Sequence, residues 1–149
     1  MSKYLLTVNV FAQNDYKWGE WTTWGDQGDG TYCNPVLPSD YSDIDCIRVG
    51  DDYYAISSTF QYSPGMVIIH SKDLVNWTKH SSVLDTSAVK WAKKAMWAPS
   101  IIHKDGKYYF FFGANDVHEG EVGGIGVAVS DRPEGPYKDL LGKPLINEI

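Results

Sequence analysis

The chain has 149 residues, of which 43% are hydrophobic and 21% are charged, and this composition indicates a folded globular domain rather than a disordered segment. Acidic residues outnumber basic ones by 19 to 13, so the formal net charge is −6 and the chain lacks the basic surface that nucleic acid or an anionic membrane would bind. No apolar run approaches the roughly 18 residues of a membrane span, so none is expected.

Aromatic residues are unusually frequent, at 14%, and 14 Gly and 7 Pro punctuate them. This composition favours β-structure, because aromatic side chains are enriched in strands and Gly and Pro in turns. It also suits carbohydrate binding, since flat rings stack on sugar faces. The two cysteines, Cys33 and Cys46, and the four scattered histidines have no metal-ligand spacing, so no metal site is expected. Cys46 lies in a strand-like run and is expected to be buried.

The N-terminal residues have the pattern of a short secretory signal. Lys3 precedes an apolar run, and a small-residue pattern that ends at Ala12 resembles a cleavage site. Two polar residues interrupt the run, so a folded first strand is the alternative. We expect residues 1–12 to be a signal peptide, residues 13–30 to be a linker, and the mature protein to be extracytoplasmic, either secreted or periplasmic.

An internal repeat organises the rest of the chain. Residues 48–58 read RVGDDYYAISS and residues 103–113 read HKDGKYYFFFG, so that a turn is followed in each by a Tyr-Tyr pair and an apolar run. The two pairs, which begin at Tyr53 and Tyr108, are 55 residues apart. Two copies of one structural unit are therefore predicted.

The segment after each of these runs repeats as well. GMVIIHSKDLVNW at 65–77 aligns with GIGVAVSDRPEGPY at 124–137, now at a spacing of 59 residues. The four additional residues fall in the connection 113–123, which is expected to be the longer loop.

Each unit is expected to contain four short strands. In the first unit they are predicted at 45–49, 53–58, 66–71 and 77–83. In the second unit they are predicted at 99–103, 108–112 and 125–130, with a last strand near Tyr137. The Asp105-Gly106 dipeptide between apolar runs is a strong hairpin signal, because a type I′ turn needs positive φ. Only residues 85–94 have a weak helical pattern.

These units predict an all-β fold. A repeat of roughly 55–60 residues with four antiparallel strands is typical of β-propeller blades. A β-sandwich is the alternative. Because propellers close with about four to eight blades, two units indicate that the chain contains only the first part of a longer propeller.

A series of short motifs follows the same order along both units. They are Asn34-Pro35-Val36-Leu37, Tyr41-Ser42-Asp43-Ile44-Asp45, Arg48-Val49-Gly50-Asp51-Asp52-Tyr53-Tyr54, Ser58-Thr59-Phe60, Pro64-Gly65, His70-Ser71-Lys72-Asp73-Leu74, Asn76-Trp77 and Trp97-Ala98-Pro99. In order and spacing they resemble the start of glycoside hydrolase family 43, the β-xylosidases, α-L-arabinofuranosidases and arabinanases, over residues 31–149. The resemblance implies a five-bladed β-propeller with its active site on the axis, of which the first two blades are present.

The same resemblance implies an inverting glycoside hydrolase that acts on arabinose- or xylose-containing plant polysaccharides or oligosaccharides. Its partners would be the carbohydrate substrate and the C-terminal blades of the same chain. No cofactor is implied as required, and an axial calcium ion in the full-length protein stays an open question because its ligands would lie downstream. Two alternatives are a non-catalytic carbohydrate-binding propeller and an interaction scaffold without sugar chemistry.

In this family a general base, a general acid and a third, tuning carboxylate carry the reaction. The resemblance places the base at Asp43, although Ile44 replaces the proline that usually follows it. Asp45 is the alternative, because the period of two in a strand puts both carboxylates on one face. Inversion needs the base and acid about 6.5–9.5 Å apart, so that a water molecule fits beside the anomeric carbon.

Three residues are candidate sugar contacts. Phe60 follows the second strand, where the resemblance implies an aromatic residue at the sugar site. Trp97 opens the innermost strand of the second unit and is expected to face the axis, and Asn115, in the loop after the next strand, is a candidate contact at the rim. Each aromatic ring could instead belong to the core.

The acid and the tuning carboxylate are expected downstream of this chain. Glu134-Gly135-Pro136 matches the acid motif of the family by its letters. The repeat places it in an outer turn, equivalent to the turn before Trp77, so Glu134 is rejected as the acid.

Overall fold

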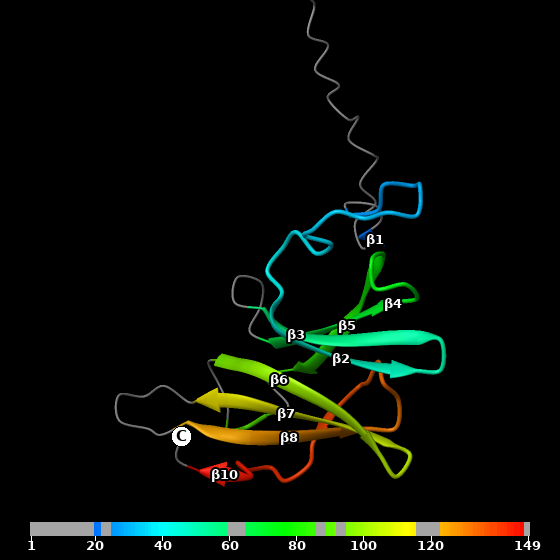
Figure 1. The fold of residues 1–149 in the computed structure, drawn as a ribbon. Coiled ribbons are helices and arrows are strands. Elements are labelled where there is room, and N and C mark those ends of the chain that lie inside the picture. The colour runs from blue at the N-terminus through cyan, green and yellow to red at the C-terminus, as the bar shows by residue number, and fades with distance from the viewer. Residues whose placement is uncertain are drawn as a thin grey trace, which may run out of the picture.

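A computed structural model describes residues 20–21, 25–59, 65–85, 89–91, 95–115 and 123–147. These residues form two separate antiparallel β-sheets that lie one on the other (Figure 1). No helix among them is long and apolar enough to cross a bilayer. The expectation of an all-β fold is confirmed, and no sheet runs continuously through both repeat units.

The first sheet contains the first repeat unit. Its strands are β1 (Glu20–Trp21), β2 (Ser42–Val49), β3 (Asp52–Thr59), β4 (Gly65–Ser71) and β5 (Trp77–Asp85). They are ordered β1-β5-β4-β3-β2, so β2 lies at one edge. A tight turn joins β2 to β3 at Gly50, where φ is +62° and glycine avoids the strain that a side chain would bring.

The second sheet contains the second unit. Its strands are β6 (Ala95–Lys104), β7 (Lys107–Asn115), β8 (Gly124–Ser130), β9 (Lys138–Asp139) and β10 (Ile146–Asn147). The order is β10-β8-β7-β6, and β9 also pairs with β8. Asp105 and Gly106 form the β6–β7 turn with φ of 51° and 73°, the positive values that the Asp-Gly signal predicts.

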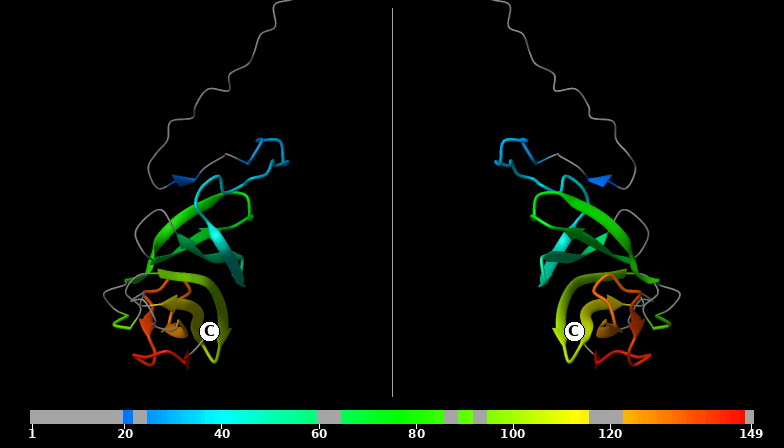
Figure 2. Two further views of the ribbon diagram at one scale, coloured as in Figure 1. Left: turned by 90° about the vertical axis from the view of Figure 1, so that its left-hand side faces the viewer. Right: turned by 90° about the vertical axis from the view of Figure 1, so that its right-hand side faces the viewer.

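The two sheets lie against each other (Figure 2), and the main hydrophobic core is made of side chains from both. Ile56 and Ile68 from the first sheet and Phe110 and Phe112 from the second have 0–1% of their surface exposed. Side chains on one face of each sheet therefore pack together, which accounts for alternate apolar residues of β3, β4 and β7.

The segment before β2 covers the opposite face of the first sheet. Val36, Leu37 and Tyr41 pack on a smaller cluster that contains Ile69 and Trp77. Burial there raises the pKa of Tyr41 to about 12. The first sheet is thus covered on both faces.

All eight strands that the repeat predicts are present, and the structure adds β1 and β10. β1 lies within residues 13–30, the stretch expected to be a linker, and pairs with β5. The expectation that Cys46 is buried is wrong: it is exposed. The reason is its place on β2, an edge strand whose side chains are covered by fewer neighbours. Of the weakly helical stretch 85–94, Asp85 belongs to β5 and residues 90–91 form a turn, while 86–88 and 92–94 lie outside the described residues.

Candidate active site

Asp43 lies in a β-bulge at the start of β2. The pairing of β2 with β3 shifts register between Ser42 and Asp45, and Asp43 has a φ of 51°. A non-glycine residue in this left-handed conformation is strained, and such strain often marks a functional position. The bulge turns the Asp43 side chain out of the regular pleat, and the residue is exposed.

The second unit has the same bulge at the corresponding place. β6 shifts register against β7 between Trp97 and Ser100, and Ala98 has a φ of 46°. Ala98 is 55 residues after Asp43, which is the spacing of the repeat. The two units therefore share one backbone feature, which carries a carboxylate in the first unit and a methyl group in the second.

Ser58 connects the two bulges. Its side chain is fully buried at the end of β3, and its hydroxyl accepts a hydrogen bond from the Ala98 backbone N–H at 3.2 Å. The same hydroxyl donates to Asp43 Oδ2 at 3.4 Å. An amide can only donate, so the serine proton is left for the carboxylate. Asp43 thus lies two hydrogen bonds away from the backbone of the second sheet.

Asp45 has a different environment from Asp43. Its Oδ2 accepts hydrogen bonds from the Ser100 hydroxyl at 3.0 Å and from the Ile101 backbone N–H at 2.8 Å. Its Oδ1 accepts one from the Cys46 N–H at 2.9 Å. Because the bulge breaks the period of two, the spacing argument that made the two carboxylates equivalent does not apply. Asp45 ties the two sheets together, and Asp43 is exposed.

Trp97 lies at the same end of the strands as Asp43. It is half-buried on β6, directly before the residue that hydrogen-bonds to Ser58, and it pairs with Gly113 on β7. Its indole lies against that glycine: a Cβ placed on Gly113 would be 2.7 Å from Trp97 Nε1.

The other two candidate sugar contacts are less fully described. Phe60 lies outside the described residues, directly after the end of β3. Asn115 was expected in a loop, but it is the last residue of β7 and pairs with Ala95. The β7 ladder continues further than its apolar run, which is why the sequence placed the end of the strand too early.

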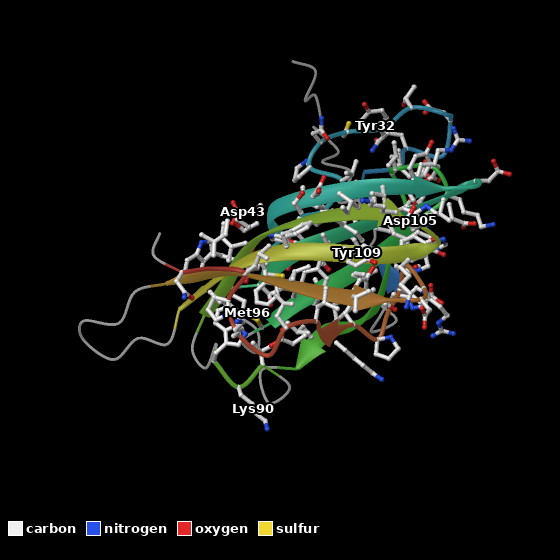
Figure 3. The ribbon with its side chains drawn as sticks, turned by 90° about the horizontal axis from the view of Figure 1, so that it is seen from below. Tyr32, Asp43, Lys90, Met96, Asp105 and Tyr109 are labelled. Atoms are coloured by element: carbon white, nitrogen blue, oxygen red, sulfur yellow. The ribbon has the colours of Figure 1, made fainter. Side chains whose placement is uncertain are left out.

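Glu134 lies toward the other end of the strands from Asp43. It follows β8 in the turn before β9, where Arg132 Nε is 3.3 Å from Glu134 Oε1. The pKa of Tyr54, a residue near the β2–β3 turn, is raised first by burial and second by the negative charge of Glu134. Glu134 is therefore close enough to that end of β3 to act on it. Figure 3 shows Asp43 and the turn residue Asp105 toward opposite ends of the molecule. The outer-turn placement that the repeat indicated for Glu134 agrees with this position.

Among the residues that the structure describes, no group of three or more His, Cys, Asp and Glu side chains could hold a metal ion. At the Asp43 end, the described residues bring together an exposed carboxylate, a buried hydroxyl and an aromatic ring. Glycoside hydrolysis uses a pair of carboxyl groups that flank the scissile bond, and the described residues at this end present one exposed carboxyl group at the same strand end as an aromatic ring.

Comparison with known proteins assigns the family. Residues 32–148 match the family model described as Glycosyl hydrolases family 43. The chain belongs to this family. The match includes both bulges and all three candidate sugar contacts, and it confirms the resemblance that the motif order indicated.

Named proteins of family 43 are similar in sequence to much of this chain. A β-xylosidase of Formosa agariphila is 42% identical over 60% of this chain and 17% of its own length. The non-reducing end α-L-arabinofuranosidase BoGH43B of Bacteroides ovatus is 32% identical over 73% of this chain and 21% of its own length. The chain thus spans well under half the length of these relatives.

Solved family 43 structures have the same arrangement of strands. BlXynB of Bacillus licheniformis superimposes with a TM-score of 0.61 at 36% identity, over 77% of this chain and 24% of that one. CoXyl43, a β-xylosidase/α-arabinofuranosidase from a compost microbial metagenome in complex with xylotriose, has a TM-score of 0.63 at 28% identity, over 74% of this chain and 37% of that one.

Two residues beside the two bulges were not singled out from the sequence. Ser58 and Gly113 occupy the same place in the two units, 55 residues apart, and each supports a residue of the adjoining bulge. The repeat alignment contains this signal. Small residues at strand ends are common, however, and only the cross-strand partners show what these two do.

Proposed function

We propose that this chain is the N-terminal part of an inverting glycoside hydrolase that cleaves xylose- or arabinose-containing oligo- and polysaccharides, with Asp43 as the general base. The observation that carries the proposal is the exposed Asp43 carboxylate in its bulge, whose one hydrogen bond among the described residues comes from Ser58. The names of the family 43 relatives support the pentose substrates.

Asp43 suits a base better than Asp45 does. A general base must reach a water molecule and take its proton, so it needs an oxygen with a free lone pair that faces solvent. Within the part of the chain that the structure describes, Asp45 accepts three hydrogen bonds, whereas Asp43 accepts a single long one. As the proton passes to Asp43, the water oxygen would attack the anomeric carbon and the glycosidic oxygen would leave with a proton from the acid.

The sugar would bind beside this carboxylate. Trp97 would stack on a sugar ring, since it is half-buried at the same strand end, and Phe60 and Asn115 would complete the contacts. The acid and the tuning carboxylate would come from later blades of the same chain, and any axial calcium would be held there too. This arrangement would leave room for the water molecule between base and substrate.

The outer face of the second sheet is the place where the next blade of a five-bladed propeller would pack. Tyr109, Phe111 and Val129 share this face and are half-buried, and Ile102 beside them is 40% exposed. None of these side chains belongs to either hydrophobic cluster of the described residues. An apolar face of this kind is stable when another sheet covers it.

The test is hydrolysis of aryl pentosides by the full-length protein. Asp43→Asn keeps the shape of the side chain and removes its basicity, so we expect hydrolysis to fall by at least about 10²-fold with the fold intact. Glu134→Gln, in the remote turn, is the matched control and should keep near-normal rates.

Loss of activity in Glu134→Gln with retention in Asp43→Asn would overturn the assignment. A wild-type protein that binds xylose or arabinose oligosaccharides and hydrolyses none would instead indicate a carbohydrate-binding propeller.

A further inference from the structure

Trp97 and Gly113 form a cross-strand pair in which one residue has the largest side chain and the other has none. The nearest atoms to a Cβ built on Gly113 would all belong to the Trp97 indole: Nε1 at 2.7 Å, Cε2 at 2.9 Å and Cδ1 at 3.2 Å. All three distances are shorter than an ordinary contact between two carbon atoms. Even alanine at position 113 would therefore displace the indole.

These distances also define how the indole lies. Nε1 is bonded to both carbons, and the three distances differ little. A point in the ring plane beyond the N–H would be much farther from the two carbons than from the nitrogen. The Gly113 Cβ position therefore lies over the ring face, and the indole lies flat on the β7 backbone. Because one ring face lies on β7, the opposite face is directed away from it. The Trp97 side chain as a whole is half-buried.

The first repeat unit shows that this pairing is specific to the second. The positions equivalent to Trp97 and Gly113 are Ser42 and Ser58, which also pair directly. Two small residues face each other there, and the serine hydroxyl contacts the catalytic candidate Asp43. In the second unit the glycine replaces that serine and makes room for the ring.

We propose that Gly113 is a positioning residue that seats the Trp97 indole flat on β7, so that the opposite ring face binds a sugar ring beside Asp43. The proposal rests on the proposed function, because it takes a pentose sugar as the ligand of Trp97. An aromatic residue over a cross-strand glycine also stabilises a strand. The experiment therefore needs a readout that stability alone would not change.

The experiment uses the full-length protein and the indole N–H resonance of Trp97, assigned by its loss in Trp97→Phe. We expect Gly113→Ala to shift this resonance and to raise both the Kd for xylo-oligosaccharides and the KM for an aryl xyloside by roughly tenfold. kcat should change much less, because Gly113 does not touch the base.

Gly126→Ala is the matched control. It makes the same substitution on the neighbouring strand β8, where the new Cβ would meet Phe112 and would lie 2.6 Å from Trp91 Cζ2 in the core. This variant should lose stability and leave the Trp97 resonance and KM close to wild type. Equal effects of the two variants on KM would show that Gly113 acts only through stability.

A double-mutant cycle covers the case in which Gly113→Ala folds poorly. In a Trp97→Ala background the space occupied by the indole is empty, so Gly113→Ala should cause no further loss of sugar affinity or stability. The same loss in both backgrounds would overturn the proposal.

The outcomes also separate this proposal from the proposed function. If the wild-type protein hydrolyses nothing, yet the sugar shifts the Trp97 resonance and Gly113→Ala abolishes that shift, hydrolysis is wrong and the role of Gly113 stands. If hydrolysis is normal and Gly113→Ala leaves resonance and KM unchanged, the role of Gly113 is wrong and the proposed function stands.

Discussion

Asp45 Oδ2 accepts a hydrogen bond from the backbone N–H of Ile101 at 2.8 Å, and this contact joins the edge strands of two separate sheets. The Ser100 hydroxyl donates to the same oxygen at 3.0 Å. Both donors lie directly after the β6 bulge, where the ladder with β7 is interrupted. One carboxylate thus satisfies polar groups that the second sheet leaves unpaired.

Asp45→Ala should destabilise the protein. It leaves a half-buried amide without its partner, and the cost of such a group is about 1–3 kcal/mol of unfolding free energy. Denaturant-induced unfolding of the full-length protein would measure the change. Asp51→Ala is the control, because the Asp51 side chain is 96% exposed and its ion pair with Arg48 is on the surface, so little change is expected. Equal effects at the two positions would contradict the role of Asp45.

Ser58→Ala should lower kcat of the full-length enzyme by roughly tenfold, the effect of losing one hydrogen bond to a charged group. The substitution removes the donor to Asp43 and the acceptor of the Ala98 amide together. KM should change little, since the Ser58 side chain is fully buried.

Ser57→Ala is the control for that measurement. Ser57 is equally buried, but the acceptors within reach of its one hydroxyl proton are the backbone carbonyls of Ser42, at 2.9 Å, and Ser58, at 3.0 Å, rather than Asp43. It should cost stability with a smaller effect on kcat. If the two variants lose kcat equally, Ser58 does not orient the base.

The turn after β4 should lose stability in acid. Burial works to raise the pKa of the Asp73 carboxyl, but hydrogen bonds from the Asn76 side chain and amide, the Val75 amide and the Ser71 hydroxyl lower it to about 2. The ordinary value is 3.8. A carboxyl with a lowered pKa in the folded state stabilises the fold fully above about pH 4 and loses this contribution as the pH falls toward about 2.

The measurement is the unfolding free energy of the wild type minus that of Asp73→Asn, taken at about pH 6 and about pH 2. We expect the wild type to be more stable at the higher pH and the difference to shrink at the lower one. A difference that does not depend on pH would show that the hydrogen bonds do not favour the charged carboxylate.

Export would be visible at the N-terminus of the mature protein. The charged residue, apolar run and small-residue pattern of residues 1–12 predict cleavage near Gln13. These residues lie outside those that the structure describes, so we propose export on the sequence alone. Mass spectrometry of protein recovered from outside the cytoplasm should find Gln13 at the N-terminus. Intact residues 1–12 in a cytoplasmic protein would contradict it.

The strands of this protein are set by short-range sequence patterns. The paired turns, the Tyr-Tyr runs and the Asp105-Gly106 hairpin are each made by neighbouring residues, so all eight predicted strands and their grouping into two sheets could be read from the repeat. β1 and β10 could not, because they lie outside the repeated segments and each pairs with the edge of a strand far along the chain.

The different environments of Asp43 and Asp45 are set by the tertiary structure. In the sequence they are two carboxylates two residues apart. Their environments differ because Asp45 meets the Ile101 amide, which lies far along the chain and comes close only when the two sheets pack together. The Trp97 orientation is equally non-local, since its ring rests on Gly113 of the neighbouring strand. Sequence pattern determines which residues can form a strand, whereas cross-sheet contacts determine which of their side chains are left free for chemistry.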